Sequence, residues 1–465
     1  MHKIVIVGGG AGGLALATRL AAKYGRRARA HQAEVILIDR RPSHIWKPLL
    51  HEVAAGSMDP HTHQLAYAAQ ATWHGFEFQL GDLVGADLVA KTASVGAVSD
   101  DEGREILPPR QISYDTLILA TGSVTNYFGV PGAEEHAIGL DSVDDAEWFR
   151  RRLIAACMRA QNTPQIRPTS AAVPETVIMR TSGSADTENG ECCTSSTSIT
   201  PVRITIVGAG ATGIELSAEL RATSETLVAY GLKLDPRRDV EIRIIEASPR
   251  ILPSLSERVA ASTALHLKKL GIQILTGESV VSVSETGLQT KSGKFIPSDL
   301  TVWAAGIKGS AVVAAIQGLD VTRLNQVVVR ETLQAKGNDD VFAIGDCASC
   351  IWHDDVRVPP RAQAAHQQAS FMVKAIGRLL EGKPLRAFRY QDMGSLVSLG
   401  HYSAVGSLMG GFFSKSMLVE GFIARVIYRW LYLMHLASLH GWLSTSIDAT
   451  SHALRRAVRP KVKLH

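Results

Sequence analysis

Cysteine is scarce in this sequence, which has five cysteines in 465 residues. Their odd number and irregular spacing exclude the disulfide framework of a small secreted protein. A charged and then apolar leader is also lacking, because an apolar strand pattern begins by Lys3. We therefore expect no secretory signal and a reducing, cytoplasmic compartment. The cysteines are Cys157, Cys192, Cys193, Cys347 and Cys350.

Long apolar runs and a strong overall charge are missing as well. No stretch of 18 strongly apolar residues occurs, so we expect no membrane-spanning helix. The net charge is only +5, and it is concentrated at one end. From Lys415 onward there are eight Lys or Arg and two acids, whereas the rest of the chain is close to neutral. This distribution argues against nucleic acid as a partner and favours an anionic membrane surface at the C-terminus.

A glycine fingerprint follows the first apolar segment. Residues 3–7 are mostly β-branched, lead into the Gly-x-Gly-x-x-Gly motif and are followed by a helical pattern. The glycines allow a tight turn and a close approach of the backbone to a pyrophosphate at the helix N-terminus. A second apolar strand ends in Asp39, whose carboxylate could accept the ribose hydroxyls of a dinucleotide. The motif glycines are Gly8, Gly10 and Gly13.

The same pattern occurs a second time. Residues 204–220 align without gaps on residues 4–20, and a further apolar strand ends in Glu246. Two fingerprints predict two dinucleotides, which for an oxidoreductase suggests FAD and a nicotinamide cofactor. Glu246 would accept both ribose hydroxyls of NADH and repel the 2′-phosphate of NADPH, and Arg250 is expected to position a loop or a phosphate. The second set of glycines is Gly208, Gly210 and Gly213.

Three further motifs carry a resemblance to a known family. Two apolar strands end in small turns, at residues 117–122 and 302–306, and Gly345-Asp346 follows another strand. Together with the fingerprints, they resemble the flavoproteins with two dinucleotide folds that include glutathione reductase. The resemblance implies an α/β fold with two Rossmann-like domains, non-covalent FAD in the first and NADH in the second. It assigns the FAD site, beyond the first fingerprint and Asp39, to Ala120, Thr121, Gly122 and Asp346, and Gly306 to the NADH site.

The disulfide reductases of that family have a Cys-x-x-x-x-Cys pair just after the first ribose acid. Here residues 45–56, IWKPLLHEVAAG, contain no cysteine. This segment and residues 359–369, PPRAQAAHQQA, instead resemble the type II NADH:quinone oxidoreductases. The resemblance implies that NADH is oxidised and a membrane quinone reduced without proton pumping. It places the flavin and the quinone entrance next to Ala362, Gln363 and Gln367, His366 as a candidate proton donor, and Glu215 near the nicotinamide.

Other functions stay open on the sequence alone. A sulfide:quinone oxidoreductase would use cysteines beside the flavin, and Cys157 with Cys347 or Cys350 could imitate that arrangement. A soluble NADH-dependent reductase of a protein carrier, or a flavin-bearing signalling protein, would share the nucleotide folds. Asp346 could merely cap a helix, and His366 could be structural. No metal site is expected, because no second cysteine pair or His cluster has zinc spacing.

The C-terminal region predicts a membrane-facing helix. After a strand-like segment at residues 395–408, apolar residues recur at spacings of three and four, and Arg425 and Arg429 fall on the opposite face. An interfacial helix, helped by the basic residues Arg455 to Lys463, would place the protein peripherally on the cytoplasmic face of the inner membrane. A core or homodimer helix is the alternative. The apolar residues are Phe422, Ile423, Val426, Ile427, Trp430, Leu431 and Met434.

We expect three regions in the chain. The FAD-binding domain is predicted at residues 1–125 and 325–392, and the NADH-binding domain at residues 126–324. The C-terminal membrane region is predicted at residues 393–465. Residues 161–200 lack periodicity and are rich in Ser and Thr, which predicts an exposed insertion.

Overall fold

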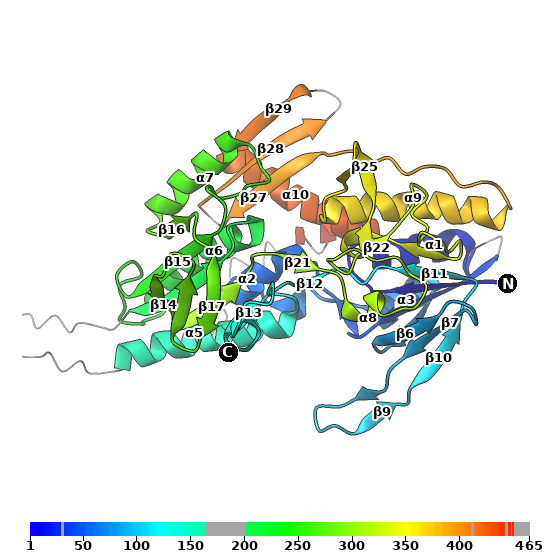
Figure 1. Ribbon diagram of the computed structural model, residues 1–465, viewed down its shortest axis with the longest axis horizontal. Coiled ribbons are helices and arrows are strands. Elements are labelled where there is room, and N and C mark those ends of the chain that lie inside the picture. Colours follow the sequence, from blue (N-terminus) through cyan, green and yellow to red (C-terminus); the bar gives the residue numbers. More distant parts are fainter. Residues whose placement is uncertain are drawn as a thin grey trace, which may run out of the picture.

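The computed structural model describes residues 1–28, 32–162, 201–400, 402–410, 413–441, 445–447 and 449–450. Two five-stranded sheets lie side by side, and a smaller sheet with a long helix lies above them (Figure 1). The predicted insertion from residue 163 onward and the basic tail fall outside the described residues.

The first sheet is parallel throughout and has the strand order β23-β11-β1-β2-β5. Its central strands are apolar and buried on both faces, as expected for a parallel sheet covered by helices. Helix α1 packs on β2 and on α9. The strands are β1 (His2–Val7), β2 (Ala33–Asp39), β5 (Glu77–Leu80), β11 (Thr116–Leu119) and β23 (Val341–Ala343), and the helices are α1 (Gly13–Tyr24), α3 (Tyr67–His74) and α9 (Ala362–Leu380).

The second sheet repeats this design with the order β13-β20-β14-β15-β16, again all parallel. It has its own hydrophobic core, separate from that of the first sheet. The α/β fold with two parallel sheets agrees with the predicted fold class. The strands are β13 (Ala137–Gly139), β14 (Val202–Val207), β15 (Val240–Glu246), β16 (Gln273–Thr276) and β20 (Leu300–Trp303), and the helices are α5 (Val143–Asn162), α6 (Ala211–Ala229) and α7 (Glu257–Lys269).

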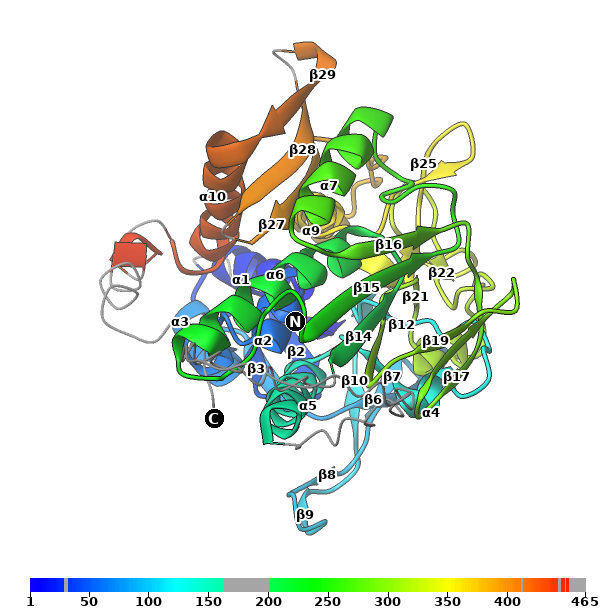
Figure 2. The same ribbon diagram turned by 90° about the vertical axis from the view of Figure 1, so that its left-hand side faces the viewer.

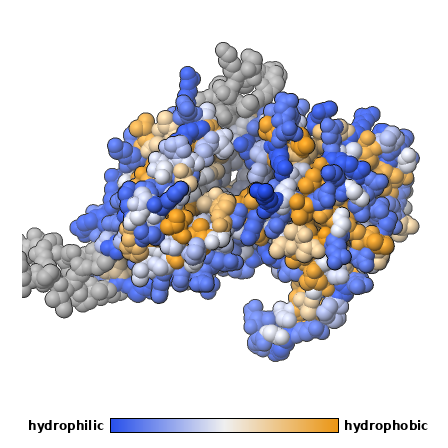
Figure 3. Space-filling view, in the orientation of Figure 1, coloured by the Kyte–Doolittle hydropathy of each residue, from blue (hydrophilic) through white to orange (hydrophobic). Residues whose placement is uncertain are grey.

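Short strands decorate and connect the two sheets. The pair β12–β21 joins the segment after the first sheet to the segment after β20, and the β8–β9 hairpin projects from the molecule with a hydrophilic tip (Figures 1 and 3). Two of the three-stranded sheets are β6 (Leu83–Asp87), β7 (Thr92–Val95) and β10 (Arg110–Ser113), and β17 (Val280–Ser284), β18 (Gly287–Thr290) and β19 (Phe295–Pro297). The strand pairs are β3 (Ser43–His44) with β4 (Leu65–Ala66), β8 (Val98–Ser99) with β9 (Glu105–Leu107), β12 (Val124–Thr125) with β21 (Ile307–Lys308), β22 (Val327–Val328) with β24 (Ala348–Ser349), and β25 (Ile351–His353) with β26 (Val356–Arg357). The short helices are η1 (Lys47–Leu49), α2 (Leu50–Ala55), η2 (Pro60–Thr62), α4 (Ala133–His136), α8 (Ala311–Ala314) and η3 (Gly345–Cys347).

The C-terminal region is an antiparallel sheet of three strands followed by one helix (Figure 2). The single strand predicted at residues 395–408 is divided, because the chain turns at Gly400, whose φ is +62°. The third strand continues to Glu420 and pairs with β28, so that the helix begins at Gly421. The elements are β27 (Gly394–Leu399), β28 (Ser403–Gly410), β29 (Phe413–Glu420) and α10 (Gly421–His440).

Helix α10 has two apolar faces. One is buried and contains Ala424, His435 and Leu439, while Tyr428 and Tyr432 pack against the second core. The other face is exposed and holds most of the predicted apolar stripe, although Ile427 packs inward against Ala404 and Val419. No helix within the described residues is both long and apolar enough to cross a bilayer. The exposed residues are Phe422, Ile423, Val426, Trp430, Leu431 and Met434.

Candidate active site

The first glycine loop joins β1 to α1 at the carboxyl end of the first sheet. Gly8 has a φ of +101°, and its amide donates to the Ile38 carbonyl at 2.8 Å. A side chain at Gly8 would collide with the Ala120 carbonyl, and one at Gly13 would collide with the Gly8 carbonyl. Both positions therefore require glycine, because no Cβ fits and Gly8 has a left-handed backbone.

Asp39, at the end of β2, holds this loop from the side. The Gly9 amide donates to its Oδ2 at 2.6 Å, and the Arg41 amide donates to its Oδ1 at 2.9 Å. Burial raises the pKa of Asp39, while these two backbone hydrogen bonds oppose the rise. Each carboxylate oxygen keeps a further lone pair that could accept a hydroxyl.

The second glycine loop, between β14 and α6, repeats these contacts. Gly208 has a φ of +106°, and its amide donates to the Ile245 carbonyl at 2.7 Å. The Ala209 amide donates to Oε2 of Glu246 at 2.7 Å, and the Ser248 amide donates to Oε1 at 2.8 Å. The alignment of the two fingerprints in sequence thus extends to their hydrogen bonds.

The neighbourhood of Glu246 agrees with the role expected of Arg250. The Arg250 guanidinium donates to the carbonyls of Leu252 and Pro253 at 3.1 and 2.9 Å, so it positions this loop. On the other side, a side chain at Gly208 would collide with Ala304, which precedes Gly306 by two residues. Gly306 itself lies against the ring of Phe128, which has a φ of +53°.

Asp346 lies beside the turn that follows β11. Its Oδ2 accepts a hydrogen bond from the Ser123 hydroxyl at 2.8 Å, and its backbone carbonyl accepts from Gln326 at 2.8 Å. Because β23 is the neighbour of β11, Asp346 reaches the same sheet edge as Gly122. The residues predicted for the first nucleotide therefore gather at the carboxyl ends of β1, β2, β11 and β23.

Both edges have room for a ligand. A Cβ placed at Gly10, Gly122 or Gly210 would meet nothing within 4 Å. Open space in front of a glycine backbone at a helix N-terminus is what a pyrophosphate requires. The residues present therefore fit one dinucleotide at each sheet edge.

The glutamines of α9 are already engaged. Gln363 donates to Asp392 at 3.2 Å and to the Gly394 carbonyl at 3.1 Å, and its Oε1 accepts from the Met393 amide. Gln367 exchanges two hydrogen bonds with the backbone of Gln391. These two side chains therefore fasten the segment that leads into the C-terminal sheet to the first turns of α9.

His366 points from α9 towards α10. Its Nε2 lies 2.8 Å from Nδ1 of His435. Burial, with a smaller contribution from Arg19, lowers the pKa of His366 to about 4. The ring is therefore neutral at pH 7, and it holds one proton for its two nitrogens.

Glu215 lies in α6 between the two nucleotide folds. Its Oε1 accepts from the Ser398 amide at 2.9 Å, and its Oε2 lies 3.6 Å from Nδ1 of His51 in α2. Burial raises the pKa of Glu215 to about 8 and lowers that of His51 to about 4. At pH 7 the pair is thus a protonated carboxyl next to a neutral imidazole. The buried Nε2 of His51 has no hydrogen-bond partner.

The cysteines of the described residues lie in different places. Cys157 is buried in the second core, whereas Cys347 and Cys350 are buried in the first. Burial raises the pKa of Cys157 and of Cys350 to about 11, and it raises that of Cys347 as well. These thiols are protonated at neutral pH and are poor nucleophiles. Cys192 and Cys193 lie outside the described residues.

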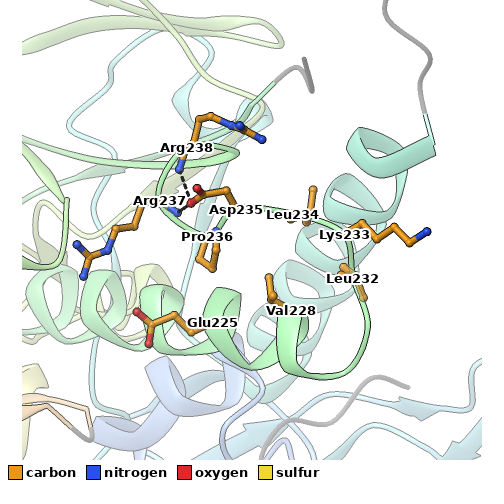
Figure 4. A pocket seen from close by; sticks show the side chains of 9 residues that line it. All are labelled: Glu225, Val228, Leu232, Lys233, Leu234, Asp235, Pro236, Arg237 and Arg238. Atoms are coloured by element: carbon orange, nitrogen blue, oxygen red, sulfur yellow. Dashed lines mark hydrogen bonds between the residues drawn. The ribbon is translucent and has the colours of Figure 1, made fainter. Parts of the chain in front are cut away.

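A surface hollow of about 610 Å³ lies at the far end of α6 (Figure 4). Glu225, which lines it, is twelve residues beyond Gly213, so the two are about 18 Å apart along the helix axis. The hollow is therefore separate from the second glycine loop. It is lined by Glu225, Val228, Leu232, Lys233, Leu234, Asp235, Pro236, Arg237 and Arg238.

Several residues at these sites carried no sequence signal. Tyr67 and His44 both bind the carbonyl of Gly9, at 2.8 and 2.9 Å. His51 and Ser398 contact Glu215, and Gln368 accepts from the Gly345 amide at 2.6 Å. All of these contacts join segments that lie far apart in the sequence, where local patterns give no information.

Comparison with known proteins gives a consistent result. The model of the pyridine nucleotide-disulphide oxidoreductase family matches residues 2–369. The chain is 38% identical to the type II NADH:quinone oxidoreductase of Haemophilus influenzae over 465 residues, which cover 100% of both chains. It is 28% identical to the type II NADH:quinone oxidoreductase Ndh of Mycobacterium tuberculosis, over 95% of this chain and 85% of that one. The solved structure of NDH2 from Plasmodium falciparum in complex with NADH has a similar fold, with a TM-score of 0.75 at 18% identity and coverage of 99% and 100%.

Proposed function

Because the chain belongs to the pyridine nucleotide-disulphide oxidoreductases and, within them, to the type II NADH:quinone oxidoreductases, we propose that it uses bound FAD to pass electrons from NADH to a membrane quinone. The reaction moves no protons across the bilayer. The single observation that supports this function best is the duplicated loop, in which a carboxylate accepts a backbone amide of the glycine loop at both sheet edges.

The two loops are assigned to different nucleotides. We place FAD at the first, with Gly8, Gly10, Gly13 and Asp39 at its dinucleotide part. The other FAD contacts are Ala120, Thr121, Gly122, Asp346 and Ala362. NADH is placed at Gly208, Gly210, Gly213, Glu246 and Gly306. Glu246 favours NADH over NADPH, because a second negative charge beside its carboxylate would be repelled.

A bound flavin supplies the chemistry, since it accepts a hydride and releases two electrons. The protein holds a proton on Glu215, whose pKa of about 8 keeps it protonated at neutral pH. We propose that Glu215 supplies a proton, with His51 as its neighbour. His366 is a weaker candidate for this role, because the proton on its Nε2 points to His435 rather than to open space.

The quinone side is built on α9. The side chains of Gln363 and Gln367 hydrogen-bond to the backbone of residues 391–394 and hold this segment against α9. In our proposal they form one wall of the quinone entrance. This arrangement supports a positioning role for both glutamines.

The predicted regions are kept as a proposal. Residues 1–125 and 325–392 would bind FAD, residues 126–324 would bind NADH, and residues 393–465 would face the membrane. The pairing of β23 with β11 supports a discontinuous first domain, because it returns residues 341–343 to the first sheet.

The exposed apolar face of α10 supports a membrane-surface location. Six large apolar residues, each at least 40% exposed, lie along a helix of 20 residues. We propose that this face lies in the boundary of an anionic membrane on the cytoplasmic side and gives a lipid-soluble quinone access to the enzyme. A homodimer that covers the same face is the alternative occupant.

A double substitution of Trp430 and Phe422 to serine tests this location. We expect the variant to lose binding to vesicles containing anionic lipid, with the yellow colour retained. The matched control is Val89→Ser, which is 96% exposed on another part of the molecule. Vesicle binding equal to that of the wild type, together with a dimer that dissociates in the variant, would favour the homodimer instead.

The electron transfer itself is tested by mixing the yellow protein with NADH in the absence of oxygen, followed by a quinone. We expect NADH to bleach the flavin and the quinone to restore the colour. Sulfide in place of NADH should leave the colour unchanged, because the described cysteines are buried and protonated. A flavin that NADH cannot bleach, or that a quinone cannot reoxidise, would contradict the proposed function.

A further inference from the structure

Three histidines from distant segments form one hydrogen-bonded chain. His44 is in β3, His435 is in α10 and His366 is in α9. Nδ1 of His44 lies 2.9 Å from the Gly9 carbonyl, and Nε2 of His44 lies 3.2 Å from Nε2 of His435. Nδ1 of His435 lies 2.8 Å from Nε2 of His366. The chain therefore runs from the first glycine loop, through the C-terminal helix, to α9.

The carbonyl at the Gly9 end of the chain fixes the direction of the first hydrogen bond. A carbonyl can only accept, so Nδ1 of His44 donates to it. With one proton on each ring, Nε2 of His44 accepts from Nε2 of His435, and Nδ1 of His435 accepts from Nε2 of His366. Each link then has one donor and one acceptor.

The surroundings keep the chain dry and rigid. The side chains of His44 and His435 are buried, at 3% and 4% exposure. The indole of Trp46 stacks on His435 with a centroid distance of 5.4 Å and an interplanar angle of 19°. Tyr432, one turn before His435 on α10, stacks on the same indole.

The loop end of the chain is held by more than one group. Tyr67 donates a second hydrogen bond to the Gly9 carbonyl, and the Gly9 amide donates to Asp39. Both polar groups of the Gly9 peptide region are therefore bound by side chains. Among the charged groups around the chain, Arg19 lies near His366, and Asp39 and Arg41 lie near Tyr67.

We propose that this chain couples the C-terminal helix to flavin binding, with His435 as the positioning residue: docked α10 holds the Gly9 carbonyl through His44, and flavin bound at that loop holds α10 in return. The inference rests on the proposed function to the extent that the first loop binds the flavin. Coupling between two sites is reciprocal, so a break at either end is felt at the other.

The first arm breaks the chain at α10 in the full-length holoenzyme. His435→Leu removes the ring that hydrogen-bonds to both His44 and His366. We expect flavin release, followed by its fluorescence after dilution, to become about tenfold faster or more, given the usual effect of unsatisfied buried polar groups. His366→Leu breaks only the outer link and should accelerate release less. His435→Gln keeps a donor and an acceptor and should restore part of the retention.

The second arm breaks the chain at the loop and observes the helix. His44→Leu should increase amide hydrogen exchange in α10, at positions 391 residues away in sequence. Val89→Ala, at a position that is 96% exposed and lies outside α10, is the matched control and should change neither measurement. The result that would overturn the inference is wild-type flavin release in His435→Leu, or unchanged exchange of α10 in His44→Leu. If His435→Leu does not fold, His435→Gln and His44→Leu decide the question alone.

Failure of this inference and failure of the proposed function give different results. The first arm measures flavin release and the second measures amide exchange in α10. The proposed function is instead tested by bleaching with NADH and recovery of the colour with a quinone. Intact coupling in a protein that a quinone cannot reoxidise would overturn the function only. If electron transfer is normal but the histidine substitutions change neither flavin release nor the exchange of α10, only the inference is overturned.

Discussion

The two glycine loops share their backbone design and differ in what holds it. In both, a glycine with positive φ donates to a carbonyl near the end of the next strand, β2 or β15, and a carboxylate accepts two backbone amides. The carbonyl of Gly9 is then bound by the side chains of Tyr67 and His44. The equivalent carbonyl of Ala209 instead accepts from the backbone amide of Leu252 at 2.9 Å.

This difference in supporting contacts bears on how long each loop would retain its nucleotide. The first loop depends on side chains that come from several distant segments, so it can be rigid only when the whole fold is assembled. The second is closed by a loop a few residues beyond its own ribose acid. We conclude that the first is suited to a cofactor that stays bound, and the second to a substrate that enters and leaves in every cycle.

The largest expected effect comes from adding a methyl group to either loop. Gly8→Ala should give a protein that is isolated without flavin, because its Cβ would overlap the Ala120 carbonyl. Gly208→Ala should stay yellow but be bleached by NADH at least about 100-fold more slowly, equivalent to ~2.7 kcal/mol in the barrier. Flavin absorbance and stopped-flow reduction measure the two effects. If both variants lost the flavin alike, the assignment of one nucleotide to each loop would be wrong.

The carboxylates give the next largest contrast. Glu246→Gln should raise the KM for NADH about tenfold and narrow the preference over NADPH, since a hydrogen bond to a charged group contributes ~1.5–3 kcal/mol. Asp39→Asn should instead weaken flavin retention and leave the KM for NADH unchanged. Glu241→Gln, on the same strand as Glu246 but at the surface end, serves as the control. Steady-state kinetics with both nucleotides and the flavin content of each variant test the contrast.

The raised pKa of Glu215 predicts a pH-dependent contribution to the stability of the folded protein. Glu215 titrates near 8 in the folded protein, against an ordinary value of 4.5. Between these values the folded chain holds more protons than the unfolded chain, so this stabilising contribution is complete below 4.5 and is lost as the pH rises towards 8. Glu215→Gln should remove a pH-dependent contribution on the order of 1–3 kcal/mol. Urea unfolding at pH 5 and pH 8 measures it, and an equal pH dependence in variant and wild type would contradict the raised pKa.

The smallest expected effect is that of a single hydroxyl. Tyr67→Phe removes one of the two side-chain donors to Gly9, and we expect a loss of ~0.5–1.5 kcal/mol, or a few-fold faster flavin release. The KM for NADH should not change, because the second loop has no such donor. Tyr114→Phe, whose hydroxyl lies near Asp87 instead, is the control. A larger effect on NADH than on flavin would invert the comparison of the two loops.

The sequence predicted the loops well because their information is local. A strand, three glycines and an acid at the next strand end lie within about forty residues, and their repetition at an offset of 200 strengthened each prediction. Cys157, Cys347 and Cys350, which a sulfide:quinone oxidoreductase could have used beside the flavin, are buried with raised pKa values, and that alternative gains no support. Their burial could not be read from spacing alone.

The unpredicted features share a different physical origin. The fold brings His44 and Tyr67 to the carbonyl of Gly9, and it brings His435 to His44. These contacts exist only in the folded chain. In α10, the exposed apolar stripe was visible in the sequence. The inward-facing stripe was not, because it includes Tyr428, Tyr432 and His435, which are polar residue types that pack against the rest of the protein. The start of this helix at Gly421 is set by the pairing of β29 with β28, which no local pattern shows.

The two apolar faces of α10 also bear on the solubility of the protein. A flexible tail released from a membrane can fold its apolar residues away, but α10 is fixed by its buried face and keeps the other one turned outward. We therefore expect the folded protein to expose a rigid apolar helix face in aqueous solution. In detergent-free buffer this exposed apolar face should lower the concentration at which the protein self-associates.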